Sequence, residues 1–159
     1  MRKLEYVWLD GYKPEQSLRS KVKVDDYMEI WSFDGSSTQQ ATGDNSDCIL
    51  NPVAEYSTID RIRADATRTS PGLEGTYVMC EVLSANNEPH PSNTRTDCQN
   101  LVSDDWWFGF EQEYFMYKDG RPLGWPEKGK RRAHGDYYCG VGAGNVVGRE
   151  IVDRHTEAC

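Results

Sequence analysis

Long apolar runs are missing from this sequence. No stretch approaches the roughly 20 apolar residues that a membrane-spanning helix needs, and the mean hydropathy is −0.77. The N-terminus, Met1 to Tyr6, leads directly into a strand pattern and has no apolar core of the signal-peptide kind. These absences argue against a membrane partner, and we expect a soluble protein of the cytoplasm.

Positive charge is also scarce. The 159 residues include 18 lysines and arginines against 26 aspartates and glutamates, which gives a formal net charge of −8. The sequence pI is about 4.9. Proteins that bind nucleic acids or acidic membranes usually present a basic surface, so we expect neither partner here.

Paired cysteines are absent. The chain has five cysteines, which are widely separated and include no Cys-x-x-Cys motif: Cys48, Cys80, Cys98, Cys139 and Cys159. This pattern argues against a disulfide framework or a zinc site. We interpret them as reduced thiols that are mostly buried as small apolar groups. The three histidines, His90, His134 and His155, likewise lack the spacing of metal ligands.

Strand patterns dominate the first half of the chain. Four runs rich in β-forming residues are predicted as strands: residues 3–9, 20–24, 27–33 and 76–83. In the first run, Leu4, Tyr6 and Trp8 share one face. Between the last two runs lies a long polar stretch, residues 34–75, and connections of that length are often functional.

The second half follows a linker. Residues 86–91 (NNEPHP) contain two prolines and resist both helix and sheet, which suits a domain boundary. A helix is predicted for residues 93–102, because competent cap residues stand at its start. Residues 118–121 (KDGR) indicate a hairpin turn.

The last segment predicts a helix over residues 146–159, with Val147, Ile151, Val152 and His155 on one stripe. The glycine-rich residues 140–144 before it lack the spacing of a dinucleotide or phosphate loop and are read as the approach to this helix. The sequence stops inside the helical pattern without a stop signal, so we expect a truncated chain.

Residues 106–114 (WWFGFEQEY) predict one aromatic strand. On such a strand Glu111 and Glu113 share a face with Trp107, and the two carboxylates lie about 7 Å apart. This spacing suits two hard cations that are held close together. The alternative is a half-buried strand whose glutamates point into water. Two carboxylates are too few for a metal pair, so the local pattern leaves both interpretations open.

A series of short motifs extends along the chain in a fixed order. They are YVWLDG at 6–11, WSFDGSST at 31–38, NSD at 45–47, MCEV at 79–82, WFGFEQEY at 107–114, GRPLGWP at 120–126 and YYCGVG at 137–142. Together these motifs resemble glutamine synthetase in its eukaryotic-like (type II) form. The resemblance extends from about Leu4 to Cys159.

The resemblance implies an α+β fold. Residues 1–88 would form an N-terminal β-grasp domain, and residues 89–159 would begin a larger catalytic domain. The implied reaction phosphorylates the side-chain carboxylate of L-glutamate with ATP, after which ammonia displaces phosphate to give glutamine. Phosphoryl transfer needs neutralised charge and aligned partners, which divalent cations provide. The implied cofactors are two or more Mg²⁺ or Mn²⁺ ions per site.

The resemblance also implies site residues. Glu111 would hold the metal ion nearer the ATP phosphates, and Glu113 the ion nearer the glutamate carboxylate. Trp107 would lie near the nucleotide, with a core aromatic as the alternative. Asp47 would reach a neighbouring subunit's site, bind ammonium and take its proton. Its local sequence alone reads as an ordinary polar turn.

The implied partners are L-glutamate, ammonium, ATP and identical subunits in a ring. Further metal ligands and substrate-binding arginines of the family lie beyond Cys159, so we expect residues 1–159 to be inactive alone. Two hypotheses stay open: the N-terminal portion of an active glutamine synthetase, or a non-catalytic remnant that only binds other subunits. An aromatic-lined carbohydrate binder would leave the ordered motifs unexplained.

Overall fold

The computed structural model describes residues 1–58, 75–111, 113–133 and 137–158. The chain forms two compact units, Met1–Trp106 and Trp107–Cys159. Within these described residues, strands and two α-helices make an α+β fold, which confirms the predicted class. The predicted domain boundary between residues 88 and 89 stays a prediction.

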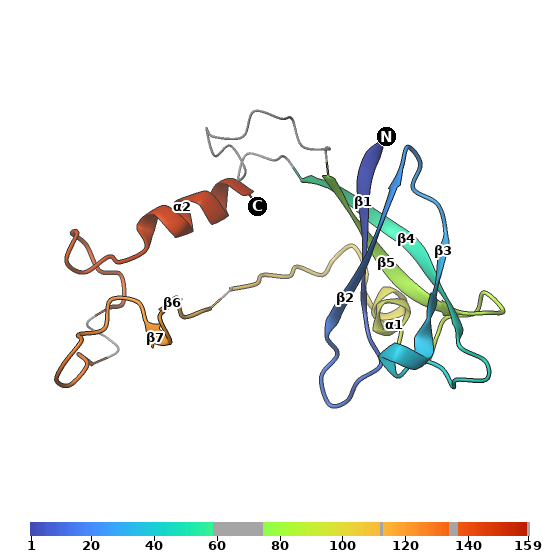
Figure 1. Ribbon diagram of the computed structural model, residues 1–159, viewed down its shortest axis with the longest axis horizontal. Helices are drawn as coiled ribbons and strands as arrows, with labels where there is room; N and C mark the ends of the chain where they lie inside the picture. Colours follow the sequence, from blue (N-terminus) through green and yellow to red (C-terminus); the bar gives the residue numbers. More distant parts are fainter. Residues whose placement is uncertain (59–74, 112, 134–136, 159) are drawn as a thin grey trace. The chain divides into compact units, whose positions relative to one another are not determined.

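The first unit is built on a mixed five-stranded sheet (Figure 1). Its strands are β1 (Arg2–Leu9), β2 (Leu18–Asp25), β3 (Trp31–Asp34), β4 (Asp47–Thr58) and β5 (Gly75–Ser84). The strand order is β2-β1-β5-β4-β3. β1 and β5 pair in parallel, and the other neighbouring pairs are antiparallel.

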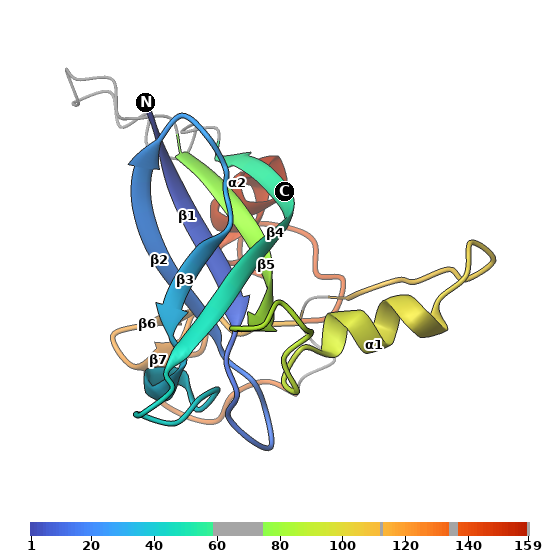
Figure 2. The ribbon, with the colours of Figure 1, turned by 90° about the vertical axis from the view of Figure 1, so that its right-hand side faces the viewer.

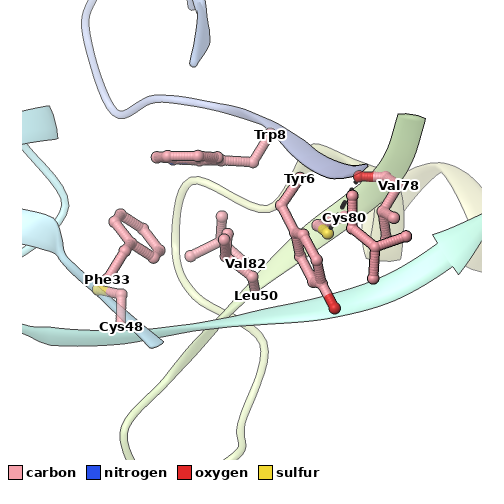
Figure 3. Close-up of a cluster of buried hydrophobic side chains, with 9 residues drawn as sticks. Tyr6, Trp8, Phe33, Cys48, Leu50, Val78, Cys80 and Val82 are labelled. Atoms are coloured by element: carbon pink, nitrogen blue, oxygen red, sulfur yellow. Dashed lines mark hydrogen bonds between the residues drawn. The ribbon is translucent and has the colours of Figure 1, made fainter. Parts of the chain in front are cut away.

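One face of this sheet carries the core. Leu4, Tyr6 and Trp8 alternate along β1 and are buried, as the sequence pattern predicts. The neighbouring strands add six buried residues to the same cluster: Phe33, Cys48, Leu50, Val78, Cys80 and Val82. Figure 3 shows Trp8 facing Phe33, with the ring centroids 4.8 Å apart. This buried apolar surface is the main force that holds the unit together.

The two edge strands of the sheet approach each other. Lys21 on β2 donates a hydrogen bond to the carbonyl oxygen of Ser32 on β3 at 2.8 Å, and its ammonium lies 3.6 Å from the centre of the Trp31 ring. Because β2 and β3 stand at opposite ends of the strand order, this contact requires a curled sheet, as Figures 1 and 2 show. The Tyr6 hydroxyl donates to the carbonyl oxygen of Glu29 at 2.7 Å.

Most of the predicted strands are confirmed. β1, β2 and β5 cover the runs at residues 3–9, 20–24 and 76–83. β3 occupies only the end of the run predicted at 27–33. In β1 and β5 the alternation is readable because one face of each strand packs on the core. In β2 the apolar residues Val22 and Val24 are instead exposed.

β4 corrects the prediction of a long connection over residues 34–75. Residues 47–58 form a strand that pairs with β3 on one side and β5 on the other. Among its residues whose burial is described, only Cys48 and Leu50 are fully buried. The other side chains of β4 show no clear alternation of apolar and polar residues. The register shift between Pro52 and Ala54 interrupts the pattern further.

The helix predicted at residues 93–102 is confirmed as α1 (Thr94–Leu101). The Asn93 side chain accepts a hydrogen bond from the backbone N–H of Thr96 at 3.3 Å, and its Nδ2 donates to the carbonyl oxygen of Val82 at 3.1 Å. The cap therefore fixes the start of α1 to β5. Figure 2 shows α1 projecting away from the sheet, and none of its residues is buried.

In the second unit, the predicted hairpin turn is confirmed. β6 (Tyr117–Lys118) pairs with β7 (Arg121–Pro122). The turn residues Asp119 and Gly120 have φ angles of 51° and 75°, in the left-handed region that favours these residue types. α2 (Arg149–Ala158) confirms most of the helix predicted at 146–159. Among the described residues, no helix is long and apolar enough to span a membrane.

The strand predicted over residues 106–114 is wrong for the described residues 106–111, 113 and 114, which belong to no strand. Alternating side chains are not sufficient for a strand, because its backbone N–H and C=O groups need a neighbouring strand as their partner. Large aromatic side chains in this segment are exposed, with Trp107 at 96% and Phe110 at 92%.

Candidate functional site

The loop between β3 and β4 leads to Asp47, the predicted catalytic residue. It begins with a 3₁₀ helix, η1 (Gly35–Thr38), which Asp34 caps. The Asp34 carboxylate accepts hydrogen bonds from the hydroxyl of Ser36 and from its backbone N–H at 2.9 Å. These hydrogen bonds from Ser36 lower the pKa of Asp34. Asp34 therefore stays ionised as part of the loop's own structure.

Gly35 closes this loop at a point where a larger residue does not fit. Its N–H donates to the carbonyl oxygen of Ser46 at 2.7 Å. A Cβ at Gly35 would lie 2.5 Å from the Sγ of Cys48. Burial raises the pKa of the Cys48 thiol, and the carboxylates of Asp47 and Asp34 add to this. Cys48 is thus a neutral packing group under the loop rather than a nucleophile.

Asp47 itself is exposed at the first position of β4. It lies opposite Asp34 in the β3–β4 register, so two carboxylates share this end of the strand pair. The Asp34 carboxylate is engaged by Ser36, whereas no described residue donates a hydrogen bond to the carboxylate of Asp47. An exposed carboxylate at the same end of a strand pair as a second one attracts cations and can accept a proton.

The turn after β1 rests on a buried carboxylate. Asp10 accepts hydrogen bonds from the backbone N–H groups of Ser17 at 2.9 Å and Tyr12 at 3.2 Å, and from the Nε of Arg19 at 2.9 Å. Burial raises the pKa of Asp10, but these hydrogen bonds and the charge of Arg19 outweigh it, and the pKa falls below its ordinary value. Asp10 is therefore an ionised structural group.

Gly11 joins this turn to η1. Its N–H donates to the carbonyl oxygen of Thr38 at 2.9 Å. Asp10 and Gly11 belong to the motif at residues 6–11, but the sequence alone gave them no role. Gln40 is buried, as is Thr38. Its burial is not predictable from the sequence, because it lies in an otherwise polar stretch without periodicity.

The other predicted site residues lie in the second unit. Glu111 and Glu113 are exposed, and Gln112 between them lies outside the described residues. Carboxylate oxygens suit Mg²⁺ and Mn²⁺. However, the described residues contain no group of three or more His, Cys, Asp or Glu side chains that could hold a metal ion. The carboxylates of Glu111 and Glu113 are thus of a type that binds these ions, but within the described part of the chain too few ligands come together to form a metal site.

Trp107 is 96% exposed, so it is not a core aromatic of the described structure. The glycine-rich segment at residues 140–144 leads towards α2, as the sequence predicts. A hollow of about 450 Å³ is found there, and Arg149 is the charged residue in its lining. The hollow is lined by Gly140, Val141, Gly142, Ala143, Val146 and Arg149.

The cysteines with a described environment are free thiols, as predicted. Cys48 and Cys80 are buried, whereas Cys98 and Cys139 are exposed. The prediction that the cysteines are mostly buried is therefore correct for only two of these four. Burial raises the pKa of Cys80 to about 12. Cys159 lies outside the described residues.

Comparison with known proteins finds a family described as "Glutamine synthetase, beta-Grasp domain", which matches residues 1–85. A glutamine synthetase of Bradyrhizobium diazoefficiens is 48% identical over 99% of this chain and 45% of its own length. The glutamine synthetase of Frankia alni is 47% identical over 98% of this chain and 43% of its own. The chloroplastic glutamine synthetase of Chlamydomonas reinhardtii is 42% identical over 98% of this chain and 44% of its own length. The chain therefore spans less than half the length of these relatives.

Proposed function

Because this chain belongs to the glutamine synthetase family, we propose that it forms the N-terminal part of a ligase that joins ammonia to L-glutamate in an ATP-dependent reaction. The observation that carries the proposal is the 48% identity to a glutamine synthetase over 99% of the chain. The relatives are about twice as long, so the activity belongs to a protein of that length.

The proposed reaction makes the glutamate side chain electrophilic. The γ-phosphoryl group of ATP passes to a side-chain carboxylate oxygen, which gives ADP and γ-glutamyl phosphate. Ammonium then loses a proton, and the resulting ammonia attacks the acyl carbon. The C–O bond to phosphate breaks, and phosphate leaves with the bonding electrons. The nitrogen loses a second proton, which the departing phosphate takes up, and glutamine remains. Alignment of the reacting groups supplies much of the rate increase.

Asp47 is the residue that we propose to bind ammonium and accept its proton. Its carboxylate is exposed, receives no hydrogen bond from a described residue and lies opposite Asp34. Two neighbouring carboxylates favour a small cation over a neutral ligand. A proton that leaves ammonium at this point passes to a carboxylate already in contact with it.

For the second unit, we propose Glu111 and Glu113 as ligands of separate Mg²⁺ or Mn²⁺ ions, Glu111 on the side of the ATP phosphates. The remaining ligands would come from outside the described residues. When bound, divalent cations neutralise phosphate charge during phosphoryl transfer. Trp107, with its indole exposed, would pack against the nucleotide.

The proposed assembly is a cytoplasmic ring of identical subunits in which Asp47 completes a neighbour's site. An exposed carboxylate at the start of β4 is compatible with such a role, because it is available to another chain. The alternative is a glutamine synthetase-like module that binds subunits without catalysis.

The test uses a protein of the relatives' length that contains this chain, supplied with L-glutamate, ammonium, ATP and Mg²⁺. We expect glutamine to form, and Asp47→Asn to lower kcat by about 10²-fold or more through loss of the proton acceptor. Asp44→Asn, an exposed aspartate of the same loop, is the matched control and should change kcat by less than about twofold. An unaltered protein that forms no glutamine would favour the non-catalytic alternative.

A further inference from the structure

Gln40 is a buried residue of the loop that leads to Asp47, with 6% of it exposed. Its Nε2 donates to the carbonyl oxygen of Leu9 at 3.2 Å and to the hydroxyl of Ser92 at 2.8 Å. Its Oε1 accepts a hydrogen bond from the hydroxyl of Thr38 at 2.7 Å. Because the carbonyl of Leu9 can only accept, the orientation of the Gln40 amide follows from the network.

The same hydrogen bonds continue into a closed ring through Ser92 and His90. The Ser92 hydroxyl accepts from Gln40, and its oxygen lies 2.9 Å from the Nδ1 of His90, to which it donates its own proton when Nδ1 carries none. The backbone N–H of Ser92 also donates to this Nδ1, at 3.1 Å, so Nδ1 carries no proton. The ring proton of His90 then sits on Nε2, which donates to the backbone carbonyl oxygen of Gln40. A ring with a consistent donor direction strengthens each of its members.

The ring fastens the loop to the sheet at two places. Leu9 is the last residue of β1, and the backbone N–H of His90 donates to the carbonyl oxygen of Val82 in β5 at 3.1 Å. Within the loop, the backbone N–H of Gln40 donates to the carbonyl oxygen of Gly35 at 2.8 Å. The loop cannot shift relative to β1 and β5 without breaking several partly buried hydrogen bonds, and each broken bond leaves polar groups without a partner.

We propose that Gln40 is a positioning residue which, through its ring with Ser92 and His90, holds the loop so that Asp47 meets ammonium in the reactive arrangement. This inference rests on the proposed role of Asp47. Gln40 and Ser92 are 52 residues apart in the sequence, so the ring also ties the loop to the segment that precedes α1. A displacement of about 1 Å in a catalytic group can cost about 100-fold in rate.

The first experiment measures steady-state kinetics in a protein of the relatives' length. Gln40→Met keeps the side-chain length but removes the amide, and we expect the KM for ammonium to rise about tenfold while the KM for ATP changes by less than about twofold. Gln99→Met, at an exposed position on α1, is the matched control and should change neither constant. His90→Gln keeps a donor near the Gln40 carbonyl and should retain more ammonium affinity than His90→Phe.

A folded Gln40→Met variant with an unchanged KM for ammonium would overturn the positioning role while leaving the proposed function intact. An unaltered protein that forms no glutamine would overturn both. A second measurement needs no variant: ¹⁵N NMR of residues 1–159 should show His90 as the neutral Nε2–H tautomer with slow exchange of that proton. The Nδ1–H tautomer, or a rapidly exchanging Nε2 proton, would show that the ring does not form.

Discussion

A methyl group added at Gly11 would lie 2.3 Å from the carbonyl oxygen of Gln39 and 2.9 Å from its carbonyl carbon. Both atoms belong to the backbone, so a change of side-chain rotamer cannot relieve the contact. Ordinary van der Waals contact for a Cβ begins at 3.4 Å, which means that one of the two segments must move by roughly 1 Å. Such a shift stretches the hydrogen bond from Gly11 to Thr38, now 2.9 Å, beyond bonding distance.

Gly11→Ala should therefore destabilise the first unit by about 2–4 kcal/mol. About 1–3 kcal/mol of this comes from the overpacked contact and about 1 kcal/mol from the lost hydrogen bond. For a domain of this size the midpoint of thermal unfolding falls by about 4–8 °C for each kcal/mol. Urea unfolding of residues 1–159, followed by far-UV circular dichroism, measures the free energy of unfolding directly.

Gly43→Ala is the matched control, because it lies in the β3–β4 loop and a Cβ there meets nothing within 4 Å. We expect it to change the free energy of unfolding by less than about 1 kcal/mol, and it can even stabilise the protein by restricting the unfolded chain. If Gly11→Ala and Gly43→Ala unfold at the same urea concentration, the close approach of the turn to η1 does not exist in solution and the reasoning fails.

Three further predictions concern the core, the buried carboxylate and the thiols. Leu50→Ala removes a fully buried side chain and should lower the free energy of unfolding in urea by about 2–5 kcal/mol. Val24→Ala, at a half-exposed position on an edge strand, should lower it by less than about 1 kcal/mol. Equal effects of the two substitutions would contradict the described core. The pKa of Asp10 is lowered in the folded state, so its contribution to stability is present above about pH 4, the unfolded value, and is lost as the pH falls through the lower folded value. The stability difference between the unaltered protein and Asp10→Asn should accordingly be largest near neutral pH and shrink in acid, and a difference that grows in acid would refute the ionised state. Burial keeps the thiols of Cys48 and Cys80 protonated and raises the pKa of Cys80 to about 12. Iodoacetamide at pH 8 should therefore label the exposed Cys98 and Cys139 first, as measured by mass spectrometry. Early labelling of Cys80 would show that its thiol is accessible.

Some elements were predictable because their signal is local. Leu4, Tyr6 and Trp8 alternate within one strand, and the residues before α1 include Asn93, the cap that the structure uses. The hairpin turn at Asp119 and Gly120 is likewise set by the φ angles that these residue types tolerate. In each case the deciding interaction spans only a few residues, so the sequence pattern contains it.

Other features depend on partners that are distant in the sequence. β4 is a strand because β3 and β5 flank it, although most of its own side chains give no alternation. Residues 106–111 have the alternation but lack a partner strand in the described structure, and the predicted strand is wrong there. A backbone ladder is a property of two segments, so the pattern of one segment cannot determine it.

The sequence by itself determined the family of this protein, the alternating core of β1 and the site residues that the family resemblance implies, because motifs and periodicity are written in residue order. Only the tertiary structure decided how the loop of Asp47 is held. Asp10, Gln40 and His90 are ordinary polar residues in the sequence. They acquire a role when folding buries Asp10 and Gln40 and brings His90 into hydrogen-bonding distance of Gln40. A buried polar group must find a hydrogen-bond partner, and which partner it finds is set by the packing of distant segments.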